Sequence, residues 1–114
     1  MKINSYSFGK IVINNKSYHK DILIFNEKVK PNWWRDKGHN LQIEDLDWVL
    51  KQNPDYLIIG TGKFGVMKVS EEVKAKIKNK GIKLFTAKTK KAVAKFNEMI
   101  EKESDLAAGF HLTC

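Results

Sequence analysis

Hydrophobic and polar residues alternate over the first quarter of the chain, as they do in short β-strands with one buried face. The alternation starts at residues 3–8 and resumes at Ile11-Val12-Ile13 and Ser17-Tyr18-His19, and a further apolar segment follows at residues 21–25. Between two of these segments lies Asn14-Asn15-Lys16, and asparagine tolerates the positive φ of a tight turn. We therefore predict short antiparallel hairpins in this region.

From residue 41 onward, segments with helical periodicity alternate with short apolar runs. The periodicity predicts helices over residues 41–50, 70–81 and 89–102. The apolar runs predict strands over residues 56–59, 82–85 and 106–112. Such alternation is typical of a largely parallel sheet with right-handed helical crossovers. The chain is therefore predicted to be one α/β domain, without an internal boundary or repeat.

An irregular segment, residues 26–40, joins these two halves and concentrates residue types that often bind ligands. It contains Trp33, Trp34, Arg35 and His39. Tryptophan and arginine dominate binding hot spots, and Arg35 can hold a carboxylate or phosphate through two parallel hydrogen bonds. The alternative is that one tryptophan fills the core under this segment while the other is partly exposed.

Composition and charge limit the possible classes of protein. A chain of 114 residues with 42% hydrophobic residues suits one globular domain with a real core. No apolar stretch approaches the roughly 18 residues that cross a bilayer, and the first residues lack the apolar core of a signal peptide. We therefore expect a cytoplasmic protein and no membrane partner. The single cysteine, Cys114, excludes an intrachain disulfide.

The net charge is +8, and Arg35 is the only arginine among 21 cationic residues. Residues 73–97 contain nine lysines and no acidic residue. Such a segment would attract nucleic acid or acidic partners through its field. A solvated surface explains it more simply, so nucleic acid is not the favoured partner.

The segment from Gly60 to Gly65 has the spacing G-x-G-x-x-G after an apolar run. A dinucleotide site also needs a helix that starts directly at the glycines and an acidic residue about 20 positions later. Here residues 66–70 separate the glycines from the next helix, and the following strand ends without a carboxylate. We therefore expect a tight turn and no nicotinamide cofactor. The backbone amides of Thr61 to Lys63, with the Lys63 ammonium, remain candidates for binding a small anion.

Three further residues have side chains with reactive or ligating chemistry. His111 and Cys114, together with His39, would supply three zinc ligands, but nothing fixes a fourth. Cys114 as a nucleophile with His111 as its base is disfavoured, because side chains three apart in a strand point to opposite faces. We therefore expect no metal and no catalytic thiol.

Asn97, on the apolar flank of the last helix, is expected to tie that helix to a loop carbonyl.

Several of these segments, taken in order, resemble the Mth-domain family. They are Trp34-Arg35 with His39, Leu57 to Gly62, Gly81-Ile82, Thr89 with Ala92 to Asn97, and Ala108 to Cys114. The family includes the adipogenesis-associated Mth domain-containing protein and, more distantly, a mitochondrial complex I assembly factor of the same fold. The resemblance implies an α/β fold: a compact three-layer domain with a central mixed sheet, helical crossovers and an additional N-terminal β-hairpin layer. It implies no catalytic mechanism.

The leading hypothesis is a non-enzymatic domain that binds a protein partner or a small anionic ligand, with no cofactor. The candidate ligand-binding residues are Trp34, Arg35, His39, Gly60, Thr61, Gly62, Lys63 and His111. The first alternative is an enzyme acting on a small anionic metabolite, with His39 or His111 as the acid–base group. The second is weak nucleic-acid binding through the lysine-rich helices. An exposed tryptophan would also permit a homo-oligomer.

Overall fold

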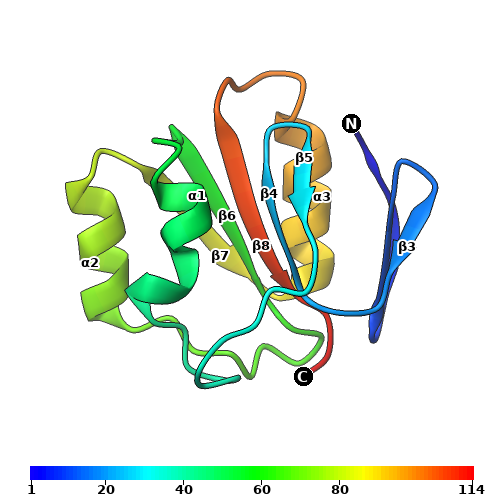
Figure 1. Cartoon of the computed structure of the whole chain (residues 1–114), viewed down its shortest axis with the longest axis horizontal. Helices are drawn as coiled ribbons and strands as arrows, with labels where there is room; N and C mark the ends of the chain where they lie inside the picture. The colour runs from blue at the N-terminus through cyan, green and yellow to red at the C-terminus, as the bar shows by residue number, and fades with distance from the viewer.

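The N-terminal residues form a small antiparallel sheet of three strands, in a computed structural model that describes residues 1–114 (Figure 1). The strands are β1 (Ile3–Ser7), β2 (Lys10–Ile13) and β3 (Lys16–Tyr18). Asn14 and Asn15 connect β2 to β3 with φ values of 49° and 66°. The predicted asparagine turn and these hairpins are thus confirmed.

A second, five-stranded sheet forms the centre of the molecule, in the order β5-β4-β8-β6-β7. Its strands are β4 (Ile22–Phe25), β5 (Lys28–Lys30), β6 (Tyr56–Thr61), β7 (Lys83–Ala87) and β8 (Leu106–His111). The sheet is mixed: β6 runs parallel to both β7 and β8, whereas β4 runs antiparallel to β5 and β8.

Strand β4 does not continue the N-terminal hairpins but pairs with β8 and β5. Ile22, Leu23 and Ile24 are all buried, so both faces of this strand need cover. A position inside the central sheet buries both faces of β4, whereas a position in the three-stranded sheet would not. Strand β5 was not predicted, because its Lys-Val-Lys sequence contains a single apolar residue.

Helices cover both faces of the central sheet. A 3₁₀ turn η1 (Ile43–Leu46) leads into α1 (Asp47–Leu50), which lies with α2 (Glu71–Asn79) on one side in Figure 1. Helix α3 (Thr89–Met99) lies on the other side, next to the three-stranded sheet. The predicted first helix is therefore shorter and partly 3₁₀, and the last one ends three residues before the predicted end.

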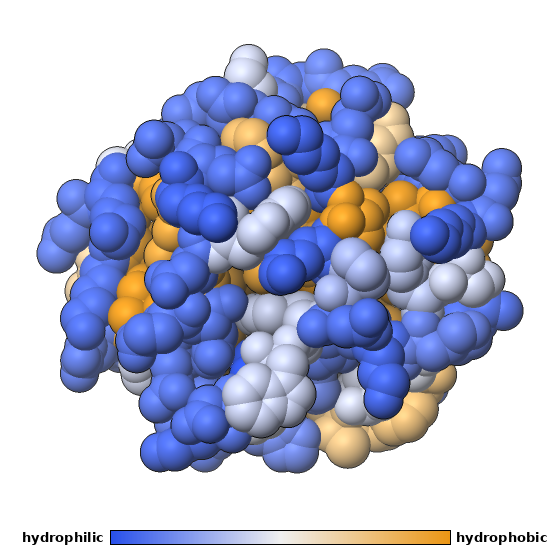
Figure 2. All heavy atoms as spheres, viewed as in Figure 1, coloured by the Kyte–Doolittle hydropathy of each residue, from blue (hydrophilic) through white to orange (hydrophobic).

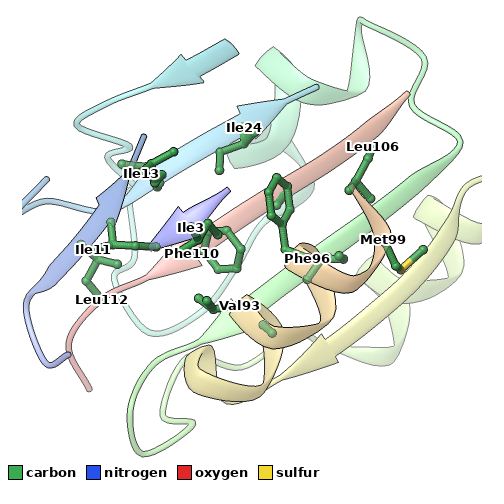
Figure 3. Packing of buried hydrophobic residues seen from close by; sticks show 14 residues of the cluster. Ile3, Ile11, Ile13, Ile24, Val93, Phe96, Met99, Leu106, Phe110 and Leu112 are labelled. Atoms are coloured by element: carbon green, nitrogen blue, oxygen red, sulfur yellow. The ribbon is translucent and has the colours of Figure 1, made fainter. Parts of the chain in front are cut away.

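The core divides into two clusters, one on each face of the central sheet. The larger cluster lies between the sheet, α3 and the N-terminal strands, and includes Phe96 and Phe110 in an edge-to-face contact with centroids 6.0 Å apart (Figure 3). The other cluster joins the sheet to α1 and α2 and contains Trp33. Together the layers give the predicted α/β domain with a mixed sheet and an N-terminal β layer.

Asn97 links the last helix to the first strand. Its Oδ1 accepts from the Ile3 amide at 2.8 Å, and its Nδ2 donates to the Ile3 carbonyl at 2.9 Å. The side chain was expected to bind a loop carbonyl, but its partner is strand β1. This reciprocal pair fixes the N-terminal sheet against α3.

The outer surface is mostly hydrophilic on the face shown in Figure 2, where apolar side chains gather in small, separate patches. The large hydrophobic residues that remain exposed are Phe8, Trp34, Phe64 and Val66. None of the helices combines the length and apolar character that crossing a bilayer requires.

Candidate functional site

A largely buried group of three charged or polar side chains lies at one end of the central sheet. Asp21 directly precedes β4, and His111 is the last residue of β8. The antiparallel register pairs Ile22 with Phe110, so that Asp21 and His111 meet across the two strands. Arg35 reaches them from the segment between β5 and η1.

Short contacts hold these three residues together. Arg35 Nη2 lies 2.7 Å from Asp21 Oδ2, and His111 Nδ1 lies 2.7 Å from the same oxygen. The second carboxylate oxygen, Oδ1, accepts from the Leu112 amide at 2.8 Å. Arg35 also donates to the Gly38 carbonyl from Nε at 3.2 Å and from Nη2 at 3.0 Å. Asp21 therefore organises the cluster by accepting from all its neighbours.

The geometry assigns the proton on the His111 ring. Arg35 Nη2 has two hydrogens, which the Gly38 carbonyl and Asp21 Oδ2 accept. The 3.0 Å contact between Nη2 and His111 Nδ1 then has no hydrogen left to share. Nδ1 therefore carries a proton and donates it to Asp21 Oδ2.

The electrostatics favour an ionised Asp21. Burial acts most strongly on its pKa and would raise it, but the hydrogen bonds from His111, Leu112 and Arg35, with the Arg35 charge, together hold the pKa of Asp21 below its usual value. The same negative charge acts on Tyr6, whose hydroxyl donates to the Leu112 carbonyl at 2.9 Å. Burial first, and then the charge of Asp21, raise the pKa of Tyr6.

The ring of Trp33 packs against the guanidinium group of Arg35. The guanidinium carbon lies 4.6 Å from the centre of the Trp33 ring, and Trp33 Nε1 donates to the Asp45 carbonyl at 2.8 Å. The ring also lies directly against the backbone of β8, because a Cβ on Gly109 would come within 3.0 Å of it. Packing and cation–π attraction thus fix the guanidinium in place.

Two polar atoms of the cluster have no partner. Arg35 is 7% exposed and His111 is 5% exposed, and neither Arg35 Nη1 nor His111 Nε2 makes a hydrogen bond. Buried polar groups without partners are rare in native proteins, because each costs about 1–3 kcal/mol. Arg35 borders an open hollow of about 580 Å³. The hollow is lined by His19, Lys20, Asp21, Asn32, Trp33, Trp34, Arg35, Gly38 and Thr113.

The predicted site residues of the 33–39 segment have different surroundings. Trp33 is buried, whereas Trp34 is 76% exposed at the hollow. This matches the alternative in which one tryptophan fills the core and the other lies at the surface. His39 is exposed, and its ring lies edge-on to His111 with centroids 5.6 Å apart. Arg35, His111 and His39 are thus neighbours, and Trp34 lies at the rim.

Gly60 and Gly62 have a packing role that the sequence alone did not indicate. A Cβ on Gly60 would come within 2.9 Å of Phe110 Cδ1 and Thr89 Oγ1, on the α3 face of the sheet and away from Arg35. Gly62, with φ of +103°, passes so close to the Cys114 backbone that a side chain would overlap it. Both glycines therefore permit close packing of the chain on itself.

The backbone amides of Gly62 and Lys63, which were expected to be free to bind an anion, both donate hydrogen bonds within the chain. The Gly62 amide donates to Thr89 Oγ1 at 2.8 Å, and the Lys63 amide donates to the Thr113 carbonyl at 2.7 Å. The Thr61 hydroxyl donates to the Ala87 carbonyl at 3.1 Å. Helix α2 starts only at Glu71, so it does not begin directly at the glycines as the helix of a dinucleotide site does. An anion at this segment would have to rely on the Lys63 side chain.

The two candidate segments lie side by side. The Lys68 amide donates to the His39 carbonyl, and the Leu41 amide donates to the Lys68 carbonyl, both at 2.9 Å. Residues 111–114 join them further, since His111 contacts Arg35 and Cys114 accepts from the Val66 amide. The sequence left this proximity undecided.

Two residues of the site were missed from the sequence. Asp21 appeared only as the first residue of an apolar strand, although a charge beside a fully apolar run is a recognisable feature. Thr89 is completely buried and links the Gly62 amide to the His111 carbonyl through its hydroxyl. No group of three or more His, Cys, Asp or Glu side chains is arranged to hold a metal ion.

Comparisons with known proteins agree with this architecture. A family model described as "Protein of unknown function (DUF498/DUF598)" matches residues 3–111. The conserved hypothetical protein PH1505 from Pyrococcus horikoshii OT3 is 26% identical, with the whole of both chains covered and a TM-score of 0.84. A protein from Bartonella henselae described as an outer membrane protein is 24% identical over 98% of this chain and 94% of its own, with a TM-score of 0.82.

A further solved structure carries the family name. A protein from Bordetella pertussis described as an Mth938-like domain is 14% identical over 97% of this chain and 85% of its own, with a TM-score of 0.73. At this identity the likeness concerns the fold alone. The match of the family model to nearly the whole chain is the stronger finding. The chain therefore belongs to the DUF498/DUF598 family of Mth-like α/β domains.

Proposed function

We propose that this protein binds a small anionic ligand in the hollow beside Arg35, through a carboxylate or phosphate group. The observation that carries the proposal is Arg35 Nη1, a buried polar atom that has no hydrogen-bond partner and belongs to a residue lining the hollow. An oxygen of an anionic group would accept a hydrogen bond from Nη1. Binding would thus supply the hydrogen bond that the chain itself does not.

The surroundings favour an anion of modest size. Lys20 and Arg35 both line the hollow, so that its two cationic side chains outnumber the single carboxylate of Asp21. The volume of about 580 Å³ lies in the range of small-molecule sites. Trp34, exposed at the rim, would cover the bound molecule or contact a protein partner.

An enzyme acting on such an anion is the second candidate. The observation that favours it is the 2.7 Å contact between His111 Nδ1 and Asp21 Oδ2, which orients the ring and leaves Nε2 as a possible acid–base atom. In that case Arg35 would anchor the anionic group and His111 would move the proton.

A cytoplasmic location is also part of the proposal, and cell fractionation tests it.

The direct test is an NMR titration of the ¹⁵N-labelled protein with inorganic phosphate and, separately, with acetate. We expect saturable shifts at the Trp33 and Trp34 indole N–H groups and at the Thr113 amide. The Arg35→Lys variant keeps the charge but loses the planar fork, so the dissociation constant should rise by about tenfold.

Lys37→Gln is the matched control, because Lys37 is an exposed cation of the same segment that does not line the hollow. It should bind as the unaltered protein does. Shifts that are spread over all lysine-rich surfaces, or equal weakening in Lys37→Gln and Arg35→Lys, would contradict the proposal. Preference for phosphate over acetate, or the reverse, identifies the anionic group.

A further inference from the structure

A second hollow, of about 680 Å³, lies beside the first turn of α3 and is separate from the Arg35 hollow. Four lysines from two parts of the chain line it, Lys63 from the glycine segment and Lys88, Lys90 and Lys91 from the start of α3. The remaining lining residues are Tyr6, Ser7, Phe8 and Ala94. None of them is acidic.

The four lysines have no ionic partner in the chain. All four are exposed, and none takes part in a salt bridge. Two lysines of α2 differ, since Lys74 and Lys76 pair with Glu71 and Glu72 at 3.6 Å and 3.2 Å. Bringing four like charges around one concave surface is unfavourable for the protein alone. An anion in the hollow would remove that repulsion.

The charges on α3 are also opposed to the helix dipole. The N-terminal end of a helix favours anions, and α2 follows this rule with Glu71 and Glu72 in its first turn. In α3 the N-cap is Lys88, and the first turn carries Lys90 and Lys91 and contains no acidic residue. Lysine charges and helix dipole thus attract an anion to the same place.

One exposed aromatic ring lines this hollow and a second lies beside it. Phe8 lines the hollow and is 49% exposed, and its neighbour Phe64, which follows the lining residue Lys63, is 62% exposed. Their ring centroids are 6.4 Å apart. Exposed aromatic rings beside lysines are the combination that binds single-stranded nucleic acid, because bases stack on the rings while phosphates contact the cations.

We propose that this hollow binds nucleotide units, with phosphates at Lys63, Lys88, Lys90 and Lys91 and a base against Phe8 and Phe64. The chemistry is shared by a free nucleoside triphosphate and by single-stranded nucleic acid. A concave surface of this volume admits a nucleotide, whereas a flat anionic membrane cannot enter it. A nucleotide therefore fits the hollow better than a lipid surface does.

The sequence indicated only a lysine-rich segment, and it favoured plain solvation. The fold adds Lys63, Phe8 and Phe64, which lie outside that segment of the chain. It also shows that the lysines of α3 gather without partners while two of those on α2 are paired.

The test is fluorescence anisotropy with a labelled single-stranded oligonucleotide of about 12 nucleotides, measured at several salt concentrations. The Lys90→Gln/Lys91→Gln variant removes two phosphate contacts, so the slope of log K against log salt should fall by about 1.4. The control is Lys78→Gln/Lys80→Gln, which removes the same charge from exposed, unpaired lysines at the end of α2. That control should keep both slope and affinity.

The aromatic part is tested without a change of charge. Phe8→Ala/Phe64→Ala should weaken oligonucleotide binding by about tenfold or more, with the salt slope unchanged. Circular dichroism establishes that each variant is folded. Competition by ATP below millimolar concentration identifies a free nucleotide as the source, and competition only by unlabelled oligonucleotide identifies nucleic acid.

Three results would overturn the proposal. The first is equal loss of binding in the α2 and α3 lysine variants, which would show attraction by total charge alone. The second is no measurable binding of either oligonucleotide or ATP at low salt. The third is stronger binding to vesicles of phosphatidylserine and phosphatidylcholine in equal parts than to either nucleotide ligand. All three leave the Arg35 site unaffected, because its residues do not line this hollow.

Discussion

His111 Nδ1 lies 2.7 Å from Asp21 Oδ2, although 90 positions separate the two residues in the chain. The other oxygen of the same carboxylate accepts from the amide of Leu112, the residue after His111. Asp21 thus fixes both the ring of His111 and the backbone beyond β8. Because Arg35 shares Oδ2, the carboxylate also sets the position of the one arginine of the protein.

Asp21→Asn is expected to lower the free energy of unfolding by about 3 kcal/mol, because it leaves the buried Arg35 charge without its counter-ion. Urea denaturation monitored by tryptophan fluorescence measures this. Asp36→Asn is the control, since Asp36 is exposed and has no ion pair, and it should change stability by less than about 0.5 kcal/mol. Equal losses in the two variants would show that the Asp21 contacts contribute little.

Stability should also depend on pH through Asp21. Its pKa is lower in the folded protein than in the unfolded chain, so the unfolded chain binds the proton first. The contribution is therefore complete above the ordinary aspartate pKa of about 3.9, and it is lost as the pH falls through the folded-state value. Urea titrations between neutral pH and the acid limit should show a steeper loss than in Asp21→Asn. Parallel curves would be evidence against this coupling.

Gly62→Ala should destabilise the protein and release residues 113 and 114. The residue has φ of +103°, and an added Cβ would overlap the Cys114 backbone. We expect a cost of about 1–3 kcal/mol from strain, together with faster hydrogen exchange at the Lys63 and Val66 amides. Gly38→Ala is the matched control, because a Cβ there has open space and an ordinary φ. Unchanged exchange in Gly62→Ala would disprove the packing argument.

Local sequence patterns determined most elements of this fold. Burial of an apolar face depends on the repeat along a single segment, so strands β1, β2 and β6 and helices α2 and α3 could be recognised one at a time. The first predicted helix was less accurate: its first turn, capped by the contact between Gln42 and Asp45, is 3₁₀, and the α-helical part starts only at Asp47. Strand β5 carried too few apolar residues to be seen.

The candidate site was determined only in part by sequence. The sole arginine of the protein and the two tryptophans beside it drew attention to the segment that carries Arg35, because tryptophan and arginine dominate binding hot spots. The glycine pattern predicted the turn, but it did not show which backbone amides are free. Whether a backbone amide is free depends on what packs against it, and here Thr89 and Thr113 occupy the donors of Gly62 and Lys63.

The sequence by itself determined the α/β class, the hairpin layer and the segment around Arg35, because each follows from residues close together in the chain. Only the tertiary structure decided that Asp21 meets His111 and that Lys63 joins the lysines of α3. The first contact depends on the antiparallel register of β4 with β8, and the second on the path of the chain after β6. Register and path are set by packing of the whole core, which no local pattern encodes.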